Sequence, residues 1–214
     1  MAGKQASVFA TTDVLRIFPS FVWKAELEPN VHGRINESVV RKLQQIRSSG
    51  PEPAPHQSWQ SGHDLLKWEE FHGLAACVYD AVRAVFDFLK LGDADFQITG
   101  CWANLNPPRA AHGQHSHPNN FLSGVYYVRT EQGADTINFH DPRPQTAIIK
   151  PPVTELNAEN TDQVVVTVRP GTMLIFPSWL SHSVDANGSD RTRISISFNV
   201  MLSNYSETMS PPLW

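Results

Sequence analysis

The chain has little cysteine: only Cys77 and Cys101 occur among its 214 residues, both in apolar surroundings. Two such cysteines indicate reduced core side chains and exclude the class of small domains framed by disulfides. The sequence also lacks any run near the roughly 18 consecutive apolar residues that a membrane span requires. Its N-terminus has no apolar segment followed by a small-residue cleavage site. We therefore expect a cytoplasmic protein without membrane contacts.

The chain also lacks a large excess of positive or of negative residues. The formal net charge is −4, and no long run of like charges occurs. A broad basic surface is the electrostatic signature of nucleic-acid binding, so no nucleic acid is expected as a partner. The length suits one domain with one large core. We expect a single domain over 1–214, made of a helical leader and support (1–94), a strand-rich core (95–204) and a tail (205–214).

The first half of the chain has the apolar spacing of helices. One amphipathic segment has Asn36 where an N-cap is expected and Gly50 where the helix should stop. A second apolar stripe runs at helical spacing from Trp68 to Leu89, and Gly92 is expected to end that helix. Its aromatic side chains indicate a face packed on the core rather than a cofactor site.

After residue 95 the apolar period changes to two, which predicts strands. Six segments have this pattern: 96–106, 121–128, 135–141, 162–170, 171–177 and 193–202. Turns that contain Pro, Gly or Asn separate them. Many short strands after a helical leader favour a mostly β protein with some α, a β-sandwich or jelly roll with N-terminal helices packed on the outside.

Histidines gather just before one of these strands, in the segment AHGQHSHPNNFLSGVYYV (111–128). His115 and His117 are two residues apart, so an extended chain points both side chains to the same face. Imidazole is a common ligand of zinc, iron, copper and nickel, so the two histidines can bind one ion at the edge of a sheet. Taken alone, the pair fits two hydrated loop histidines equally well.

A third histidine, His182, follows a later apolar strand, and Arg193 comes after ten further residues. Arg193 and Ser195 share the polar face of an otherwise apolar strand. A buried guanidinium is costly without an anion, and arginine is well shaped to hold a carboxylate bidentately. The partner is either a bound small carboxylate or a structural acid, Asp185 or Asp190. We favour the bound carboxylate because His182 is close in sequence.

Several phrases together resemble those of the iron(II)/2-oxoglutarate-dependent oxygenases, especially small bacterial and phage members. They are HSHPNNFLSGVYYV (115–128), HDPRP (140–144), GTMLIFPSWLSHSV (171–184) and RISISFN (193–199). The resemblance covers most of the chain and is best from Trp102 to Asn199. It implies a double-stranded β-helix, the cupin-like form of the jelly roll. It also implies Fe(II) as metal, 2-oxoglutarate as co-substrate, and hydroxylation of an unknown substrate with release of succinate and CO2.

The resemblance makes His115 and His182 ligands of iron. The wider superfamily has an acid two residues after the first histidine, where this chain has His117. Three alternatives follow: a three-histidine site, a remote acid such as Asp141, or water in the third position. We favour the three-histidine site because its geometry is local.

The resemblance also places the distal carboxylate of 2-oxoglutarate on Arg193, with the Ser195 hydroxyl as a further donor. Tyr127 and Asn104 match positions that contact the co-substrate in related enzymes. From the residues alone, Tyr127 is equally a half-buried strand aromatic, and Asn104 is equally a turn residue.

Two rival functions are compatible with the same residues. One is a cupin-type metal enzyme without 2-oxoglutarate, either a three-histidine dioxygenase or a zinc hydrolase or isomerase. The other is a non-enzymatic jelly-roll binding module with incidental histidines. Formation of succinate separates the first rival from the oxygenase, and metal content separates the second. The expected partners are a small-molecule or peptide substrate, with a homodimer as one option.

Overall fold

The change of apolar period separates helices from strands in the computed structural model, which describes residues 8–49, 56–143 and 150–203. In chain order the elements are β1 (Trp23–Glu26), α1 (Pro29–Ser48), β2 (Trp59–Gln60), the short 3-10 turns η1 (Leu65–Lys67) and η2 (Glu69–Phe71), α2 (His72–Leu89), β3 (Phe96–Asn106), β4 (His112–His115), β5 (Leu122–Arg129), β6 (Thr136–His140), β7 (Gln163–Thr167), β8 (Thr172–Pro177), β9 (His182–Val184) and β10 (Arg193–Leu202). The predicted tail 205–214 lies outside the described residues.

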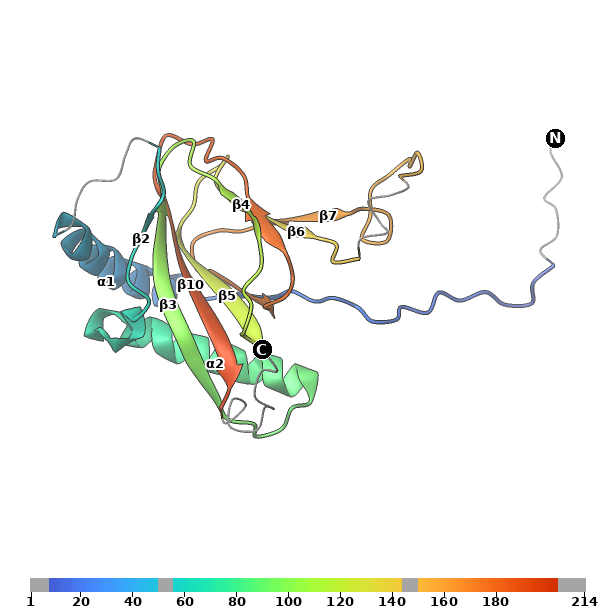
Figure 1. Cartoon of the computed structure of the whole chain (residues 1–214), viewed down its shortest axis with the longest axis horizontal. Helices are drawn as coiled ribbons and strands as arrows, with labels where there is room; N and C mark the ends of the chain where they lie inside the picture. Colours follow the sequence, from blue (N-terminus) through green and yellow to red (C-terminus); the bar gives the residue numbers. More distant parts are fainter. Residues whose placement is uncertain (1–7, 50–55, 144–149, 204–214) are drawn as a thin grey trace, which may run out of the picture.

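The strands form two antiparallel sheets. The larger has the order β1-β8-β5-β10-β3-β2 and the smaller the order β4-β9-β6-β7. In Figure 1, α1 and α2 lie on one side of the larger sheet, and β4, β6 and β7 lie on the other. One apolar cluster joins the helices to the larger sheet, and a second fills the space between the two sheets. This is a jelly-roll arrangement with helices on the outside, as the sequence predicts.

Helix α1 begins earlier than the sequence suggests. It starts at Pro29, whose fixed φ suits the first turn of a helix, so Asn36 lies inside the helix and the predicted N-cap is wrong. The Asn36 side chain bonds to the sheet instead: Nδ2 donates to the Val128 carbonyl at 3.0 Å, and Oδ1 accepts from the Tyr126 hydroxyl at 2.7 Å. The predicted stop at Gly50 lies outside the described residues.

The second helical stripe is divided. Two 3-10 turns precede α2, and Trp68 between them is 44% exposed, with Lys42 Nζ 3.6 Å from the centre of its ring. Most of the rest of the stripe is buried, as expected, and Leu89 at its end is partly buried. The helix ends at Leu89, and its C-cap Lys90 has φ 59°, so the left-handed cap comes two residues before the predicted Gly92. Among the residues that the structure describes, no helix combines the length and the apolarity needed to cross a membrane.

Alternation predicts the long strands well. β3 and β10 have the predicted bounds, and β5, β6, β7 and β8 lie within three residues of theirs. The sequence does not predict β1, β2 or β9, which are two to four residues long. β1 and β2 form the two edges of the larger sheet, so residues before 95 contribute to that sheet. The division into leader and core stays a prediction.

The strand β10 has one apolar and one polar face. Even-numbered residues within 194–200 pack in the helix-facing cluster, while odd-numbered residues within 193–199 point toward the smaller sheet. On the helix side, the ring of Phe198 lies against Gly124 of β5, its partner in register. A Cβ at Gly124 would lie 2.1 Å from that ring, so glycine is required at this close approach. The polar face of β10 is the floor of the candidate site.

Candidate metal centre and anion pocket

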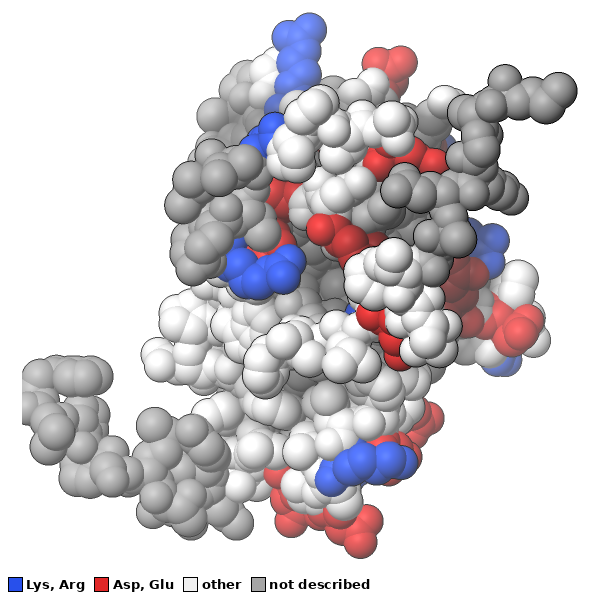
Figure 2. Space-filling view, turned by 90° about the vertical axis from the view of Figure 1, so that its right-hand side faces the viewer, with Lys and Arg blue, Asp and Glu red and all other residues white. Residues whose placement is uncertain are grey.

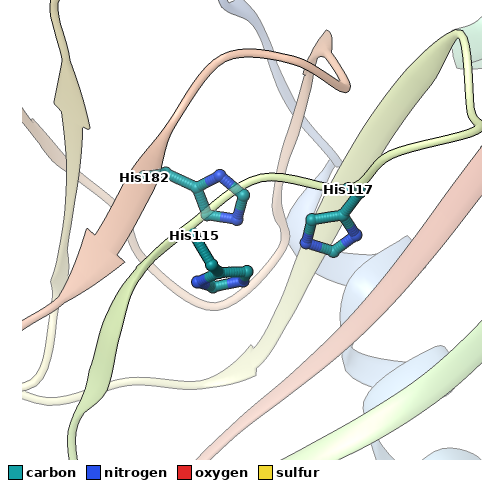
Figure 3. A group of neighbouring side chains, drawn as sticks. All are labelled: His115, His117 and His182. Carbon is teal, nitrogen blue, oxygen red and sulfur yellow. The ribbon is translucent and has the colours of Figure 1, made fainter.

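Three histidines from distant parts of the chain meet at the edge of the smaller sheet. His115 of β4 pairs in register with His182 of β9, and the centres of their rings are 4.4 Å apart. His117 lies beyond the end of β4, with ring centres 5.1 Å and 5.2 Å from those of the other two. One ligand nitrogen from each residue lies within 4.8 Å of the others. Figure 3 shows the three rings converging on one space.

Each ring has its Nδ1 within hydrogen-bond distance of an oxygen acceptor. The three pairs are His115 with the Gly113 carbonyl at 2.8 Å, His182 with the Leu180 carbonyl at 3.0 Å, and His117 with Asn199 Oδ1 at 3.0 Å. An oxygen acceptor places the proton on Nδ1 and leaves the Nε2 lone pair free. The Nε2 of His117 is buried without a protein partner. The set therefore offers three Nε2 ligand atoms to one ion.

The surroundings keep two of these rings neutral. Burial is the main cause that lowers the pKa of His182, to about 4, and burial likewise lowers the pKa of His117. A neutral imidazole is the form that binds metal. His182 is buried, His117 half-buried and His115 exposed, so the cluster lies where the cavity meets solvent.

The remote acid considered from sequence does not reach this cluster. The carboxylate of Asp141 accepts hydrogen bonds from Arg143, at 2.9 Å from Nε and 2.6 Å from Nη2. In the described part of the chain, the candidate metal-binding group consists of three histidines without a carboxylate. The geometry therefore favours the three-histidine alternative over a ligand role for Asp141.

The residues predicted for the co-substrate form a row across the larger sheet. Ser195 of β10 lies opposite Tyr127 of β5 and Asn104 of β3, and Arg193 lies two residues earlier on β10. These four side chains and the three histidines line one cavity. The structure thus brings together all seven residues that the sequence singles out.

Arg193 is buried without a counter-ion. It is 4% exposed, Nη1 donates to the Thr136 carbonyl at 3.3 Å, and Nε has no partner. No ion pair of Arg193 occurs within residues 8–49, 56–143 and 150–203, so neither Asp185 nor Asp190 neutralises it. Burial lowers the pKa of Arg193, yet a guanidinium stays protonated at neutral pH. A buried unpaired cation beside a cavity favours an anionic ligand.

Tyr127 and Asn104 differ in their readiness to bind a ligand. The Tyr127 hydroxyl is buried without a partner, and burial raises its pKa, so it remains a neutral donor. Asn104 lies inside β3 rather than in a turn, and its amide is already bonded to Gln60 at 2.7 Å and to Ser197 at 2.9 Å. The Tyr127 hydroxyl is therefore free to bind a carboxylate, whereas the Asn104 amide stabilises the wall of the cavity.

Sequence reasoning assigns no role in the site to several polar residues near the cavity. Asn106 and Asn138 each carry a buried Oδ1 without a partner. His112 Nε2 lies 3.0 Å from Asn106 Nδ2, and burial, followed by the charge of Arg193, lowers the pKa of His112 to about 4. Asn199 reaches His117 from β10. The sequence indicates these positions in one way only: Asn106 lies two residues from Asn104 and Asn199 four residues from Ser195, so each shares a strand face with a predicted site residue.

Comparisons with known proteins bear on the family and the fold of this chain. A family model described as "Putative 2OG-Fe(II) oxygenase" matches residues 100–199, which hold all seven residues. No curated protein matches the chain.

Solved structures share the fold over most of the chain. The epimerase SnoN from nogalamycin biosynthesis, described as non-heme and α-ketoglutarate dependent, has a TM-score of 0.62 at 13% identity, over 91% of this chain and 89% of its own. A Pseudomonas putida prolyl-4-hydroxylase has a TM-score of 0.59 at 17% identity, over 86% and 93%. HygX from Streptomyces hygroscopicus, solved with nickel and 2-oxoglutarate, has a TM-score of 0.60 at 12% identity, over 86% and 83%. The predicted double-stranded β-helix is confirmed.

Proposed function

We propose, from the premise that residues 100–199 belong to the 2OG-Fe(II) oxygenase family, that this chain hydroxylates a small molecule or peptide with Fe(II) and 2-oxoglutarate. One observation carries the proposal: a three-histidine cluster and a buried guanidinium without a counter-ion line the same cavity. An oxygenase of this kind requires a metal site and a co-substrate site, and the two candidate sites come from the two sheets and face one cavity.

The histidines would hold the metal through Nε2 of His115, His117 and His182. Imidazole nitrogen suits iron, and the orphaned Nε2 of His117 is the strongest sign that a ligand belongs there. When bound together, iron and 2-oxoglutarate supply the oxidising chemistry, with release of succinate and CO2. Because His117 is neutral, the ligand set has one negative charge fewer than two histidines and a carboxylate.

The co-substrate would be oriented by Arg193. Its guanidinium would bind the distal carboxylate, which would satisfy the orphaned Nε and neutralise the buried charge. Tyr127 and Ser195, which face each other in register, would donate hydrogen bonds to the same carboxylate. Asn104 holds the wall of the pocket through Ser197.

Apolar side chains complete the cavity and exclude water from it. They are Val125, Ile137, Phe176 and Val184. A dry wall strengthens the attraction between Arg193 and a carboxylate and protects reactive species from side reactions.

The face of the molecule drawn in Figure 2 gives no reason to expect a polyanionic partner. Figure 2 shows basic and acidic side chains interspersed on one face, without a broad basic patch. This supports a small-molecule or peptide substrate. A cytoplasmic location and the option of a homodimer stay predictions.

A second candidate is a three-histidine metal enzyme that does not use 2-oxoglutarate. The absence of a carboxylate from the described cluster favours it. The unpaired Arg193 favours the oxygenase, because a cupin-type or zinc enzyme has no need of a buried carboxylate receptor.

Succinate formation tests the proposal. Protein purified without a His tag is incubated with Fe(II), ascorbate and 2-oxoglutarate, and succinate is measured for the wild type, His182→Ala and Arg193→Ala. We expect succinate from the wild type and its loss in both variants. Arg191→Ala is the matched control, since Arg191 forms a surface ion pair with Glu131 at 2.7 Å. Equal succinate from all four proteins contradicts the proposal, and bound metal without succinate supports the second candidate.

A further inference from the structure

We infer that Asn199, supported by Ser123, is a positioning residue that fixes the tautomer and orientation of the His117 ring. The role of that ring as a metal ligand rests on the proposed function, but its fixation does not. Neither Asn199 nor Ser123 would touch the metal.

The three histidines obtain their acceptors in different ways. His115 and His182 each bond to the backbone carbonyl two residues earlier, so their tautomers follow from the local chain. His117 bonds instead to a side chain 82 positions away, Asn199 of β10. Only this acceptor can be removed by substitution, which makes its effect measurable.

The amide of Asn199 is itself held in one orientation. Asn199 lies opposite Ser123 of β5 in register. The Ser123 hydroxyl donates to Asn199 Oδ1 at 2.8 Å, and His117 Nδ1 lies 3.0 Å from the same oxygen. Two donors on one carbonyl oxygen keep that oxygen toward the ring. The pairing of β10 with β3 shifts between Asn199 and Val200, an irregularity of the kind that redirects side chains.

The face of the ring is held separately. Trp102 stacks on His117 with ring centres 5.8 Å apart, and His63 stacks on Trp102 at 4.7 Å. Asn199 therefore fixes the ring through its edge and Trp102 through its face. With both fixed, the buried Nε2 is turned to the space that the other two histidines share, as Figure 3 shows.

Loss of the acceptor has two consequences. A buried N–H without a partner is costly, so the Nδ1–H tautomer loses its advantage and the proton moves in part to Nε2, where it blocks a metal ion. Partners of this kind typically change metal affinity by about 10–100-fold. An aspartate at 199 still accepts from Nδ1 and should preserve the ligand.

Nickel binding measures the effect without enzymatic turnover. The dissociation constant for Ni²⁺ is determined by calorimetry for the wild type, Asn199→Ala, Asn199→Asp and Ser123→Ala. We expect about 10–100-fold weaker binding for Asn199→Ala, a smaller loss for Ser123→Ala, and affinity near that of the wild type or tighter for Asn199→Asp. If Asn199→Ala does not fold, the other two variants carry the comparison.

Asn36→Ala is the matched control. Asn36 is an amide that also bridges elements through its side chain, since it joins α1 to β5 by two hydrogen bonds on the helix side of the sheet. Its loss should lower thermal stability and leave the Ni²⁺ affinity unchanged. An equal loss of affinity in Asn36→Ala, or wild-type affinity in Asn199→Ala, overturns the inference.

A metal-free readout keeps this inference separate from the proposed function. The ¹⁵N chemical shifts of the His117 ring report its tautomer in the apo protein. We expect the Nδ1–H form in the wild type and in Asn199→Asp, and a mixture in Asn199→Ala. An Nε2–H ring in the wild type contradicts the inference. A wild type that binds no metal but shows the Nδ1–H ring contradicts the proposed function alone.

Discussion

The guanidinium carbon of Arg193 lies 5.9 Å from the centre of the Tyr127 ring, and both side chains carry buried polar atoms without a partner. They come from neighbouring strands of one sheet and line one cavity. An unpaired cation and an unpaired hydroxyl side by side form an incomplete hydrogen-bond network, and a carboxylate completes it.

Arg193→Met separates binding from stability. The variant should lose 2-oxoglutarate affinity by at least about 30-fold, because it removes one partner of a buried charge pair. Without co-substrate its melting temperature should equal or exceed that of the wild type, since a buried charge is replaced by a similar apolar volume. Calorimetry and thermal melts measure both. A large drop in apo stability would indicate a structural role for Arg193 instead.

Tyr127→Phe makes a smaller change in the same pocket. One neutral donor to a carboxylate is lost, so the KM for 2-oxoglutarate should rise by roughly 5–10-fold. The apo protein should be as stable as the wild type, because the hydroxyl has no partner to lose. Steady-state kinetics and a thermal melt check these outcomes, and an unchanged KM would remove Tyr127 from the binding site.

The stability of the metal-free protein should depend on pH. The folded pKa of His182, about 4, lies below its ordinary value of 6.5 because the ring is buried. The unfolded chain therefore binds more protons between these values, and stability falls as pH drops through this window. Denaturant unfolding at several pH values measures the slope, and His182→Gln should flatten it. Parallel curves for both proteins would contradict the low pKa.

Gly124→Ala tests the close approach of β5 and β10. The added Cβ meets the Phe198 ring at 2.1 Å, so we expect a loss of about 1–3 kcal/mol in the free energy of unfolding, or more. Gly33→Ala is the control: apart from its own helix backbone and chain neighbours, no atom lies within 4 Å of the added Cβ. In α1 this substitution should gain about 0.5–1 kcal/mol. Adding Phe198→Leu should recover part of the loss. Equal stability of the two alanine variants would contradict the packing.

Local patterns predict those parts of the fold that local forces determine. Strict alternation gives the bounds of β3 and β10, and the phrase around His115 and His117 gives most of the candidate centre. The short strands β1, β2 and β9 form because neighbouring strands supply their hydrogen bonds. They are too short for an alternation of apolar and polar residues to be recognised in the sequence. Asn36 is a residue type that favours helix N-caps, but here its side chain bonds to β5 from within the helix. Asn199 looks like any polar strand residue until register places it beside His117.

A crystal structure of the protein with Ni²⁺ and 2-oxoglutarate would test the central arrangement most directly. We predict anomalous density for one ion bound by Nε2 of His115, His117 and His182, with a carboxylate of 2-oxoglutarate on the guanidinium of Arg193. An ion elsewhere, a coordination shell that includes Asp141 in place of His117, or a co-substrate without contact to Arg193 would contradict it.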